Sequence, residues 1–178
     1  GPLFDSKHYR CQLEQSDLER NAGIPLCDYL EQGWREGINP NPFFDVSFYL
    51  EQCPDVANAG MEPLGHFIRF GSSEKRNPHP IFDIAFYLEK NPDVAQSGVG
   101  PLQHFILNGL HEGCEPNADF NSKEYLLQNQ DVAQPGIPAA LHYAMHGYRE
   151  NRMINAPRRS FGHFSHRPLV SIIVVSYN

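Results

Sequence analysis

The sequence predicts an all-α fold, a solenoid of four helical repeats of about 38 residues each. Three observations lead to this prediction. The segments 43–59 (FFDVSFYLEQCPDVANA) and 81–97 (IFDIAFYLEKNPDVAQS) are closely similar in sequence and lie 38 residues apart. Glycine recurs at the same interval, at Gly71, Gly109 and Gly147. Proline and glycine divide each repeat into segments whose length and apolar pattern are typical of short helices.

The repeat period divides the chain into units and flanking segments. The four units span residues 3–42, 43–80, 81–118 and 119–156, and they are called units 1 to 4 below. Units 2 and 3 are the most alike, whereas units 1 and 4 are less regular, which is typical of the terminal repeats that cap an array. The flanking segments are residues 1–2, which look like a protease-cleavage scar from expression, a basic linker at 157–168, and an apolar strand at 169–178.

Each unit is predicted to contain three short helices, which unit 3 illustrates. Asp83 stands at the N-cap position of the first helix. Pro92 suits the first position of the second helix, with Asn91 before it as the cap. The third helix starts at Pro101 and stops at Gly109, and unit 2 carries the same signals 38 residues earlier. Because each helix is too short to be stable alone, packing between helices must stabilise the fold.

Large apolar side chains recur at one spacing in successive units, and they are predicted to form a continuous hydrophobic core. These positions are Phe44, Phe82 and Phe120; Tyr49, Tyr87 and Tyr125; Leu50, Leu88 and Leu126; Val56, Val94 and Val132; Leu64 and Leu102; and Phe67, Phe105 and Tyr143. Each such side chain contributes roughly 1.5–3 kcal/mol when it is fully buried. An aromatic stripe could also hold a sugar, and the core interpretation is favoured.

Two polar positions also recur, and both are interpreted as structural. They are His66, His104 and His142, and Asp55, Asp93 and Asp131. Each histidine is expected to make a local hydrogen bond, and each aspartate to sit in the first turn of a helix. Metal binding or acid–base chemistry is the alternative, but equivalent side chains of successive repeats lie on the order of 10 Å apart, so they cannot share one metal. Asp28 replaces the histidine in unit 1.

The charge of the chain limits the partners it is expected to bind, and its cysteine content indicates the compartment. With a formal net charge of −7 and a pI near 5.7, the chain lacks the basic character that nucleic-acid binding requires. Cys11, Cys27, Cys53 and Cys114 are neither spaced like zinc ligands nor dense enough for a disulfide scaffold, which favours reduced thiols in the cytoplasm. The sequence has no apolar stretch of the ~20 residues that a membrane span needs.

The repeat itself resembles a known one. Its pattern is F-D-x-x-x-Y-L-x-x-x-P-D-V-A, followed by P-L-x-H-F and a glycine. It is similar to a repeat found in bacterial multidomain glycosyltransferases and in some large secreted repeat proteins. Units 2 and 3 match the pattern closely, unit 4 less closely and unit 1 weakly, and the sequence lacks the calcium-binding G-G-x-G-x-D repeats of the secreted relatives.

The last residues of the chain favour the glycosyltransferases over the secreted repeat proteins. The phrase LVSIIVVSYN at 169–178 is typical of a strand buried on both faces of a parallel sheet. It is similar to the opening strand of inverting family 2 glycosyltransferases, in which the end of the strand meets the nucleotide. The resemblance implies that Ser176 and Tyr177 help to hold a nucleotide sugar in the intact parent enzyme. An ordinary apolar strand from an unrelated α/β domain is the alternative.

Together, the repeat and the strand imply a non-catalytic helical-repeat module of a bacterial glycosyltransferase. Such a module would bind a glycan acceptor or a partner protein, or associate with itself through residues 169–175. The chain as given is not expected to be an enzyme or to need a cofactor, because the acidic pair that holds a divalent metal (Mg or Mn) in the intact parent would follow residue 178. The implied location is the bacterial cytoplasm. The alternative is an autonomous structural or adhesive repeat protein, which would be secreted.

Overall fold

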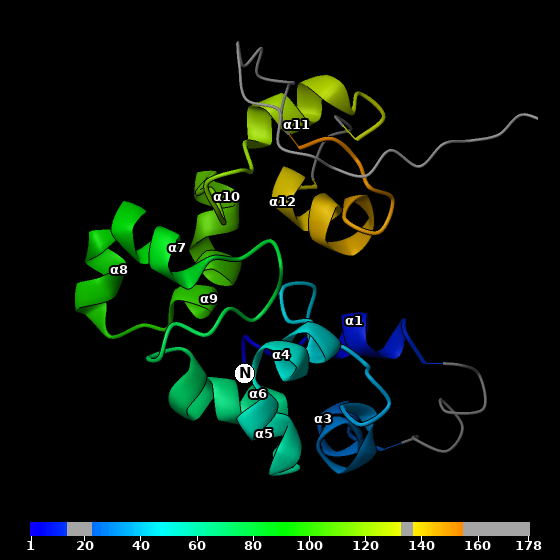
Figure 1. Cartoon of the computed structure of the whole chain (residues 1–178). Coiled ribbons are helices and arrows are strands. Elements are labelled where there is room, and N and C mark those ends of the chain that lie inside the picture. The colour runs from blue at the N-terminus through cyan, green and yellow to red at the C-terminus, as the bar shows by residue number, and fades with distance from the viewer. Residues whose placement is uncertain (14–22, 133–136, 155–178) are drawn as a thin grey trace, which may run out of the picture.

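The computed structural model describes residues 1–13, 23–132 and 137–154, and Figure 1 shows their arrangement. Within these ranges the ordered elements are helices joined by turns, with isolated bridges but no strand or sheet. The all-α prediction is therefore confirmed for the described part of the chain. The predicted linker at 157–168 and the predicted strand at 169–178 lie outside the described residues.

The helices follow one another in a similar order in each unit. Unit 1 contains α1 (Ser6–Arg10), α3 (Pro25–Asp28) and the π-helical turn η1 (Tyr29–Gly33). Unit 2 contains α4 (Val46–Gln52), α5 (Pro54–Asn58), α6 (Pro63–His66) and η2 (Phe67–Gly71). Unit 3 contains α7 (Ile84–Lys90), α8 (Pro92–Ser97), α9 (Pro101–His104), η3 (Phe105–Gly109) and α10 (Leu110–Glu112). Unit 4 contains α11 (Ser122–Gln128), α12 (Ala139–His142) and η4 (Tyr143–Gly147).

Side-chain caps start the first helix of each unit. Asp83 accepts a hydrogen bond from the Phe86 N–H at 3.0 Å, and Asp45 has the same role in α4, so both predicted N-caps are confirmed. Asn91 occupies the cap position of α8 but makes no capping bond with its side chain. Its amide donates instead to the Tyr87 carbonyl at 2.8 Å, which satisfies a carbonyl at the end of α7.

The third helix of each unit is not the continuous α-helix that the sequence predicts. It begins as α-helix and changes to a π turn at its middle: in unit 2, α6 ends at His66 and η2 starts at Phe67. The Ser72 N–H bonds to the carbonyl of Phe67, five residues earlier, at 2.9 Å. Single π turns inside α-helices are uncommon and are frequently found at functional sites. Here one occurs at the same place in each of the four units, so it is a regular feature of the repeat.

The predicted core positions are largely buried. The recurring phenylalanine residues from Phe44 to Phe120, the recurring tyrosines and the recurring valines have at most 5% of their surface exposed. The leucine position is different, because Leu50, Leu88 and Leu126 are only partly buried and pack against the edge of the core. Tyr143 is also only partly buried, so the prediction of burial holds only in part for the leucine position and for Tyr143.

Each of the first three units is closed by a backbone hydrogen bond between its beginning and its end. The N–H of the capping aspartate donates to a proline carbonyl 33 to 35 residues later, at 2.8–3.0 Å; the pairs are Asp5–Pro40, Asp45–Pro78 and Asp83–Pro116. The bond places the start of the first helix beside the chain that leaves the third. Each unit is therefore a closed block around its own tyrosine.

Some contacts join units that are not neighbours in the sequence. The ring of His79, at the end of unit 2, lies 5.8 Å from that of Tyr148 in unit 4. A cavity of about 210 Å³ adjoins this contact, and its lining includes His8 from unit 1 and Arg149 from unit 4. The first and fourth units therefore line the same cavity.

Candidate functional site

The recurring histidines lie inside their units, each against a tyrosine of the first helix. Their Nδ1 atoms lie 2.8–2.9 Å from the tyrosine hydroxyl oxygens, in the pairs His66–Tyr49, His104–Tyr87 and His142–Tyr125. In unit 1, where Asp28 replaces the histidine, the Tyr9 hydroxyl donates to Asp28 Oδ2 at 2.6 Å. Each predicted histidine therefore has a hydrogen-bond partner within its own unit.

A glycine at the end of each π turn lies against the same tyrosine hydroxyl. A Cβ atom added at Gly109 would come within 2.5 Å of the Tyr87 oxygen, and one added at Gly147 would come equally close to the Tyr125 oxygen. The corresponding pairs in the other units are Gly33–Tyr9 and Gly71–Tyr49. The close approach explains why glycine returns at this position every 38 residues: a side chain there would displace the hydroxyl from its partner.

Burial shifts the pKa of the tyrosines in these pairs and of His142. It raises the pKa of Tyr125 to about 12 and also raises the pKa of Tyr87. Burial lowers the pKa of His142, and the nearby Arg152 guanidinium lowers it further. At neutral pH the pair in unit 4 is therefore a neutral hydroxyl beside a neutral imidazole, which forms a hydrogen bond without needing a counter-ion.

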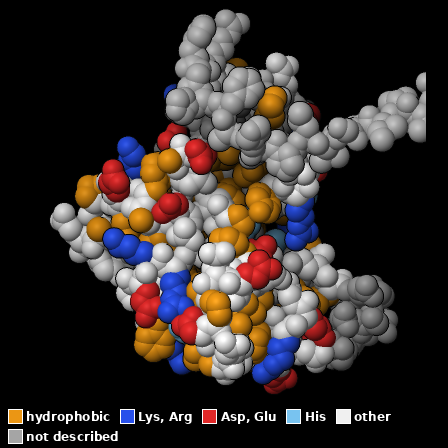
Figure 2. Space-filling view, viewed as in Figure 1, with side chains coloured by type: hydrophobic (Ala, Val, Ile, Leu, Met, Phe, Trp, Pro, Cys, Tyr) orange, Lys and Arg blue, Asp and Glu red, His pale blue; other side chains and the backbone are white. Residues whose placement is uncertain are grey.

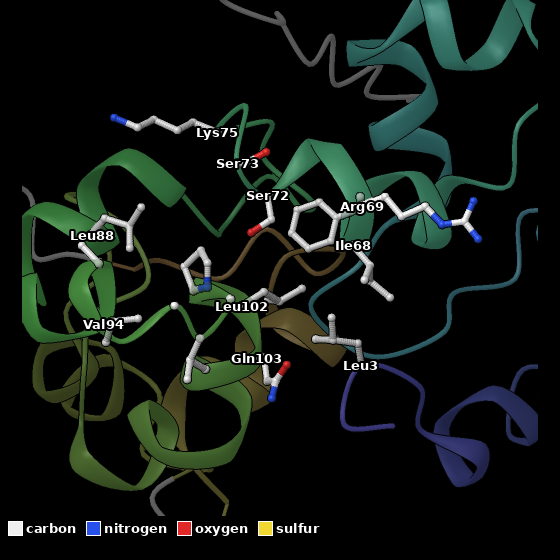
Figure 3. A pocket seen from close by; sticks show the side chains of 16 residues that line it. Leu3, Ile68, Arg69, Ser72, Ser73, Lys75, Leu88, Val94, Leu102 and Gln103 are labelled. Atoms are coloured by element: carbon white, nitrogen blue, oxygen red, sulfur yellow. The ribbon is translucent and has the colours of Figure 1, made fainter.

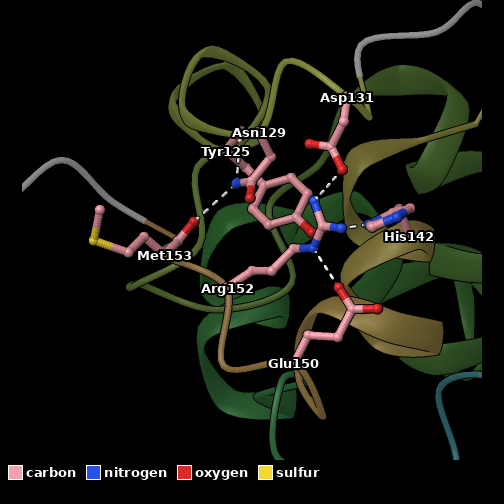
Figure 4. Close-up of polar contacts among 7 residues, drawn as sticks. All are labelled: Tyr125, Asn129, Asp131, His142, Glu150, Arg152 and Met153. Carbon is pink, nitrogen blue, oxygen red and sulfur yellow. Dashed lines mark hydrogen bonds and ion pairs between the residues drawn. The ribbon is translucent and has the colours of Figure 1, made fainter.

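Two of the recurring aspartates form ion pairs with an arginine at the end of their unit. Asp55, in the first turn of α5, lies 2.7 Å from Arg76 Nη1, and Asp131 lies 2.6 Å from Arg152 Nη1. Figure 4 shows the second of these clusters, in which Arg152 also pairs with Glu150. The arginine hydrogen bond lowers the pKa of both aspartates. Asp131 lies in a turn and not in the predicted first helical turn.

Unit 3 has no such arginine, because Cys114 occupies the position of Arg76. Asp93 lies in the first turn of α8, as predicted, without an ion pair among the described residues. The Cys114 Sγ lies 3.5 Å from Asn91 Oδ1, and burial raises the pKa of this thiol. The three aspartates therefore share a sequence position but not a set of contacts.

The described residues do not assemble a metal site. They contain no group of three or more His, Cys, Asp or Glu side chains placed to hold a metal ion. The ring centroids of His142 and His146 are 5.4 Å apart, but the carboxylate of Asp131 already forms an ion pair with Arg152. Ser176 and Tyr177, implied as nucleotide-sugar residues, lie outside the described part of the chain.

A groove between units 2 and 3 is the candidate binding site. It lies between η2 and the α8–α9 pair and has a volume of about 430 Å³ (Figure 3). This falls within the roughly 300–1,000 Å³ that ligand pockets occupy. Its lining is mainly aliphatic, with Leu88, Val94 and Leu102 from unit 3. Ile68 and Val99 also line it and are 55% and 39% exposed, so part of this apolar surface faces solvent.

Two cationic side chains border this groove. Arg69 comes from η2 and Lys75 from the turn after it, and the described lining includes no carboxylate. Neither side chain has an ion pair with another described residue. Figure 3 shows them at different edges of the groove, with their charged ends directed away from Leu102. The groove therefore has an apolar centre and positive charge at its edges.

Apolar side chains also reach the surface elsewhere, as Figure 2 shows on the face seen in Figure 1. The positions of Ile68 and Val99 are filled by Leu30 and Met61 one repeat earlier, and both of these are exposed. The described helices include none with the length and apolar composition needed to cross a bilayer.

Comparisons with known proteins give this chain no family assignment. Neither family models, nor curated proteins, nor solved structures gave a match. Function is therefore inferred from the residues and contacts of the chain itself.

Proposed function

We propose that the chain is a non-catalytic binding module of a bacterial family 2 glycosyltransferase, made of four helical repeats stacked as a short solenoid that closes on itself, so that its first and fourth units line one cavity. The module binds a partner protein or the glycan acceptor, and self-association is its other possible use. Recurrence of the tyrosine hydrogen bond and of the π turn in units 1 to 4 supports the four-unit arrangement.

The groove between units 2 and 3 is the single observation that carries the binding role. It combines an aliphatic lining, partly exposed at Ile68, with the cations Arg69 and Lys75, which have no ion pair within the described part of the chain. The whole chain has 21 acidic and 14 basic residues, so carboxylates are in excess. Two basic side chains that have no carboxylate partner among the described residues, at one apolar groove of such a chain, can contact a ligand.

The link to glycosyl transfer is supported by the repeat pattern and by the phrase at 169–178. In this proposal Ser176 and Tyr177 contact the nucleotide sugar in the intact parent. A divalent metal (Mg or Mn) would bind the diphosphate through residues that follow this chain. The 178 residues then supply recognition and leave the chemical step to the domain that follows.

Calorimetry with a panel of nucleotide diphosphosugars tests this division of labour. We expect the 178-residue chain to bind them with a dissociation constant no better than about 1 mM, because two residues at a strand end supply few contacts. Micromolar binding would show that the repeats carry the donor site, and the proposal would be wrong.

The coding sequence beyond residue 178 tests the link to a catalytic domain. A D-x-D motif within about one further domain length, roughly 100 residues, supports it. Further repeats or a stop codon would favour an autonomous structural or adhesive repeat protein.

A further inference from the structure

We propose that the groove between η2 and α8–α9 binds an extended peptide of a partner protein, in which an aliphatic side chain is flanked by acidic residues. This inference rests on the binding role proposed above and names the class of ligand. Three features of the groove support it: the kind of apolar surface, the charge at its edges, and the backbone conformation of one of its cations.

The apolar surface suits an aliphatic side chain better than a sugar ring. Of the branched aliphatic residues that line the groove, Ile68 and Val99 are exposed and Leu88 is partly buried, whereas Val94 and Leu102 belong to the core beneath them. Sugars are usually held by stacking on an exposed aromatic face. The aromatic residue of the described lining, Phe67, is only 1% exposed and its ring packs on Tyr49 inside unit 2. The described lining therefore offers van der Waals contact for a branched side chain and no aromatic platform.

The charge at the edges is particular to this junction of units. One repeat earlier, Glu31 and Gly37 occupy the positions of Arg69 and Lys75. One repeat later, the same positions hold Leu107 and Gly113. Units 1 and 3 therefore have no basic residue at either of these two positions. Carboxylates placed on both sides of an apolar anchor would meet them, because the two cations stand at different edges of the groove (Figure 3).

Lys75 has an unusual backbone conformation for a residue with a side chain. Its φ is +57°, in the left-handed region, where Gly37 and Gly113 have φ of +76° and +74°. Asn151 occupies the position in unit 4 with φ of +51°. Glycine is the residue that adopts this conformation without strain. Unit 2 therefore has a lysine where two other units have the more stable choice, which is expected if the charge serves binding.

Polar groups in the lining can meet the backbone of such a peptide. The Gln103 side chain is half-buried at the groove, and it has no hydrogen bond within the described residues. The Ser72 hydroxyl lies nearby and is likewise without a described partner. An extended peptide has one N–H and one carbonyl in each residue, so it can pair with both groups.

The test uses the full 178-residue chain and a fluorescently labelled peptide with a central Ile-Leu pair between glutamate residues. Two matched peptides replace either the glutamates by lysine or the Ile-Leu pair by serine. We expect fluorescence anisotropy to show that the first peptide binds, that both replacements weaken binding, and that affinity falls as salt is added. Equal affinity for the glutamate and lysine peptides would overturn the proposal.

Lys75→Gly separates a binding effect from a folding effect. The change removes the charge and relieves the backbone strain of a left-handed residue that has a side chain. The melting temperature should therefore stay constant or rise, while peptide affinity falls roughly 3-fold. Arg69→Leu, which introduces the residue of unit 3, should weaken binding by a similar factor. Asn151→Gly is the control, because it relieves the same conformation in unit 4 and should leave peptide affinity unchanged. Unchanged affinity in both Lys75→Gly and Arg69→Leu would overturn the proposal.

A panel of acidic oligosaccharides, measured in the same way, distinguishes this inference from the proposed function. Binding of an oligosaccharide in place of the peptide, lost in Lys75→Gly, would overturn the peptide assignment and keep the binding role of the groove. If neither ligand binds and nucleotide diphosphosugars bind with micromolar affinity, both proposals are wrong. Peptide binding that depends on Lys75, with no oligosaccharide binding, supports both.

Discussion

Units 2 and 3 have nearly the same interior and different surfaces. Inside, Tyr49 and Tyr87 are both fully buried and both bond to a histidine at 2.8–2.9 Å. At the surface, Arg76 of unit 2 forms two ion pairs, whereas Cys114 at the same position of unit 3 forms none with the residues that the structure describes. Packing fixes the interior residues, while the surface positions are free to differ. Recognition is therefore to be sought at the positions where the units disagree.

The largest expected effect concerns His79, at a position where unit 3 has Asn117. Burial lowers the pKa of His79 to about 4, with Arg149 acting in the same direction and Asp45 in the opposite one. The unfolded chain binds a proton at this residue below its ordinary pKa of 6.5, whereas the folded chain does so only below about 4. Stability is therefore lost as the pH falls from about 6.5 to about 4, by up to about 3 kcal/mol.

His79→Asn, which introduces the residue of unit 3, isolates this effect. Urea unfolding at a series of pH values should show a smaller loss of stability between pH 6.5 and 4 in the variant than in the original chain. The same loss in both proteins would show that His79 is not the group responsible.

The second prediction concerns a glycine that the two units share. Gly109→Ala places a methyl group against the Tyr87 hydroxyl and should lower the free energy of unfolding by roughly 1–3 kcal/mol. Gly71→Ala should cost a similar amount, because it meets Tyr49 in the same way. Gly100→Ala is the control, since its nearest neighbours would be 3.9 Å from the added atom. Thermal unfolding of the three variants measures the difference, and equal stability of all three would contradict the packing described.

The third prediction concerns the shared histidine. His104→Ala removes the partner of the Tyr87 hydroxyl and should cost roughly 1–2 kcal/mol, the lower part of the usual range because His104 is only half-buried. His111→Ala, at an exposed position of the same unit, should leave the melting temperature unchanged. An unchanged melting temperature in His104→Ala, together with lost ligand binding, would show that this histidine serves binding and not structure.

The smallest effect is expected from a change that makes unit 3 resemble unit 2. Cys114→Arg should allow an ion pair with Asp93 and Glu112, which are the counterparts of the two carboxylates beside Arg76. Because these groups are exposed, the gain should be a small rise in melting temperature that disappears in high salt. A clear fall in melting temperature would show that the Cys114 thiol fits its site in a way that arginine does not.

The sequence predicts the helices and most of the core because both depend on local signals. Asp83 is followed at once by an apolar helical run, and Pro92 and Pro101 mark the next two starts. The spacing of Tyr49 and Tyr87 likewise indicates burial without reference to any other unit. The partial exposure of Leu88 was not predictable, because it depends on which neighbouring helix covers that side of α7.

The π turns and the groove could not be predicted from these signals. A π turn uses residues that also form α-helices, so η2 has no distinctive composition. The groove joins η2 of unit 2 to α8 and α9 of unit 3, and it exists only once the two units are placed side by side. A signal for Lys75 was nevertheless present: Gly37 and Gly113, one period away on either side, indicate a left-handed position that a lysine rarely fills.

The contact of His79 with Tyr148 has a consequence for how the chain unfolds. In a linear repeat array each unit touches only its neighbours, so the ends can open one unit at a time. Here unit 4 rests on the end of unit 2, and units 1 and 4 line one cavity. Opening either terminal unit then removes contacts from a distant part of the chain. We expect amide hydrogen exchange to show one cooperative transition across the described helices, with the terminal units protected to a similar degree as the central ones.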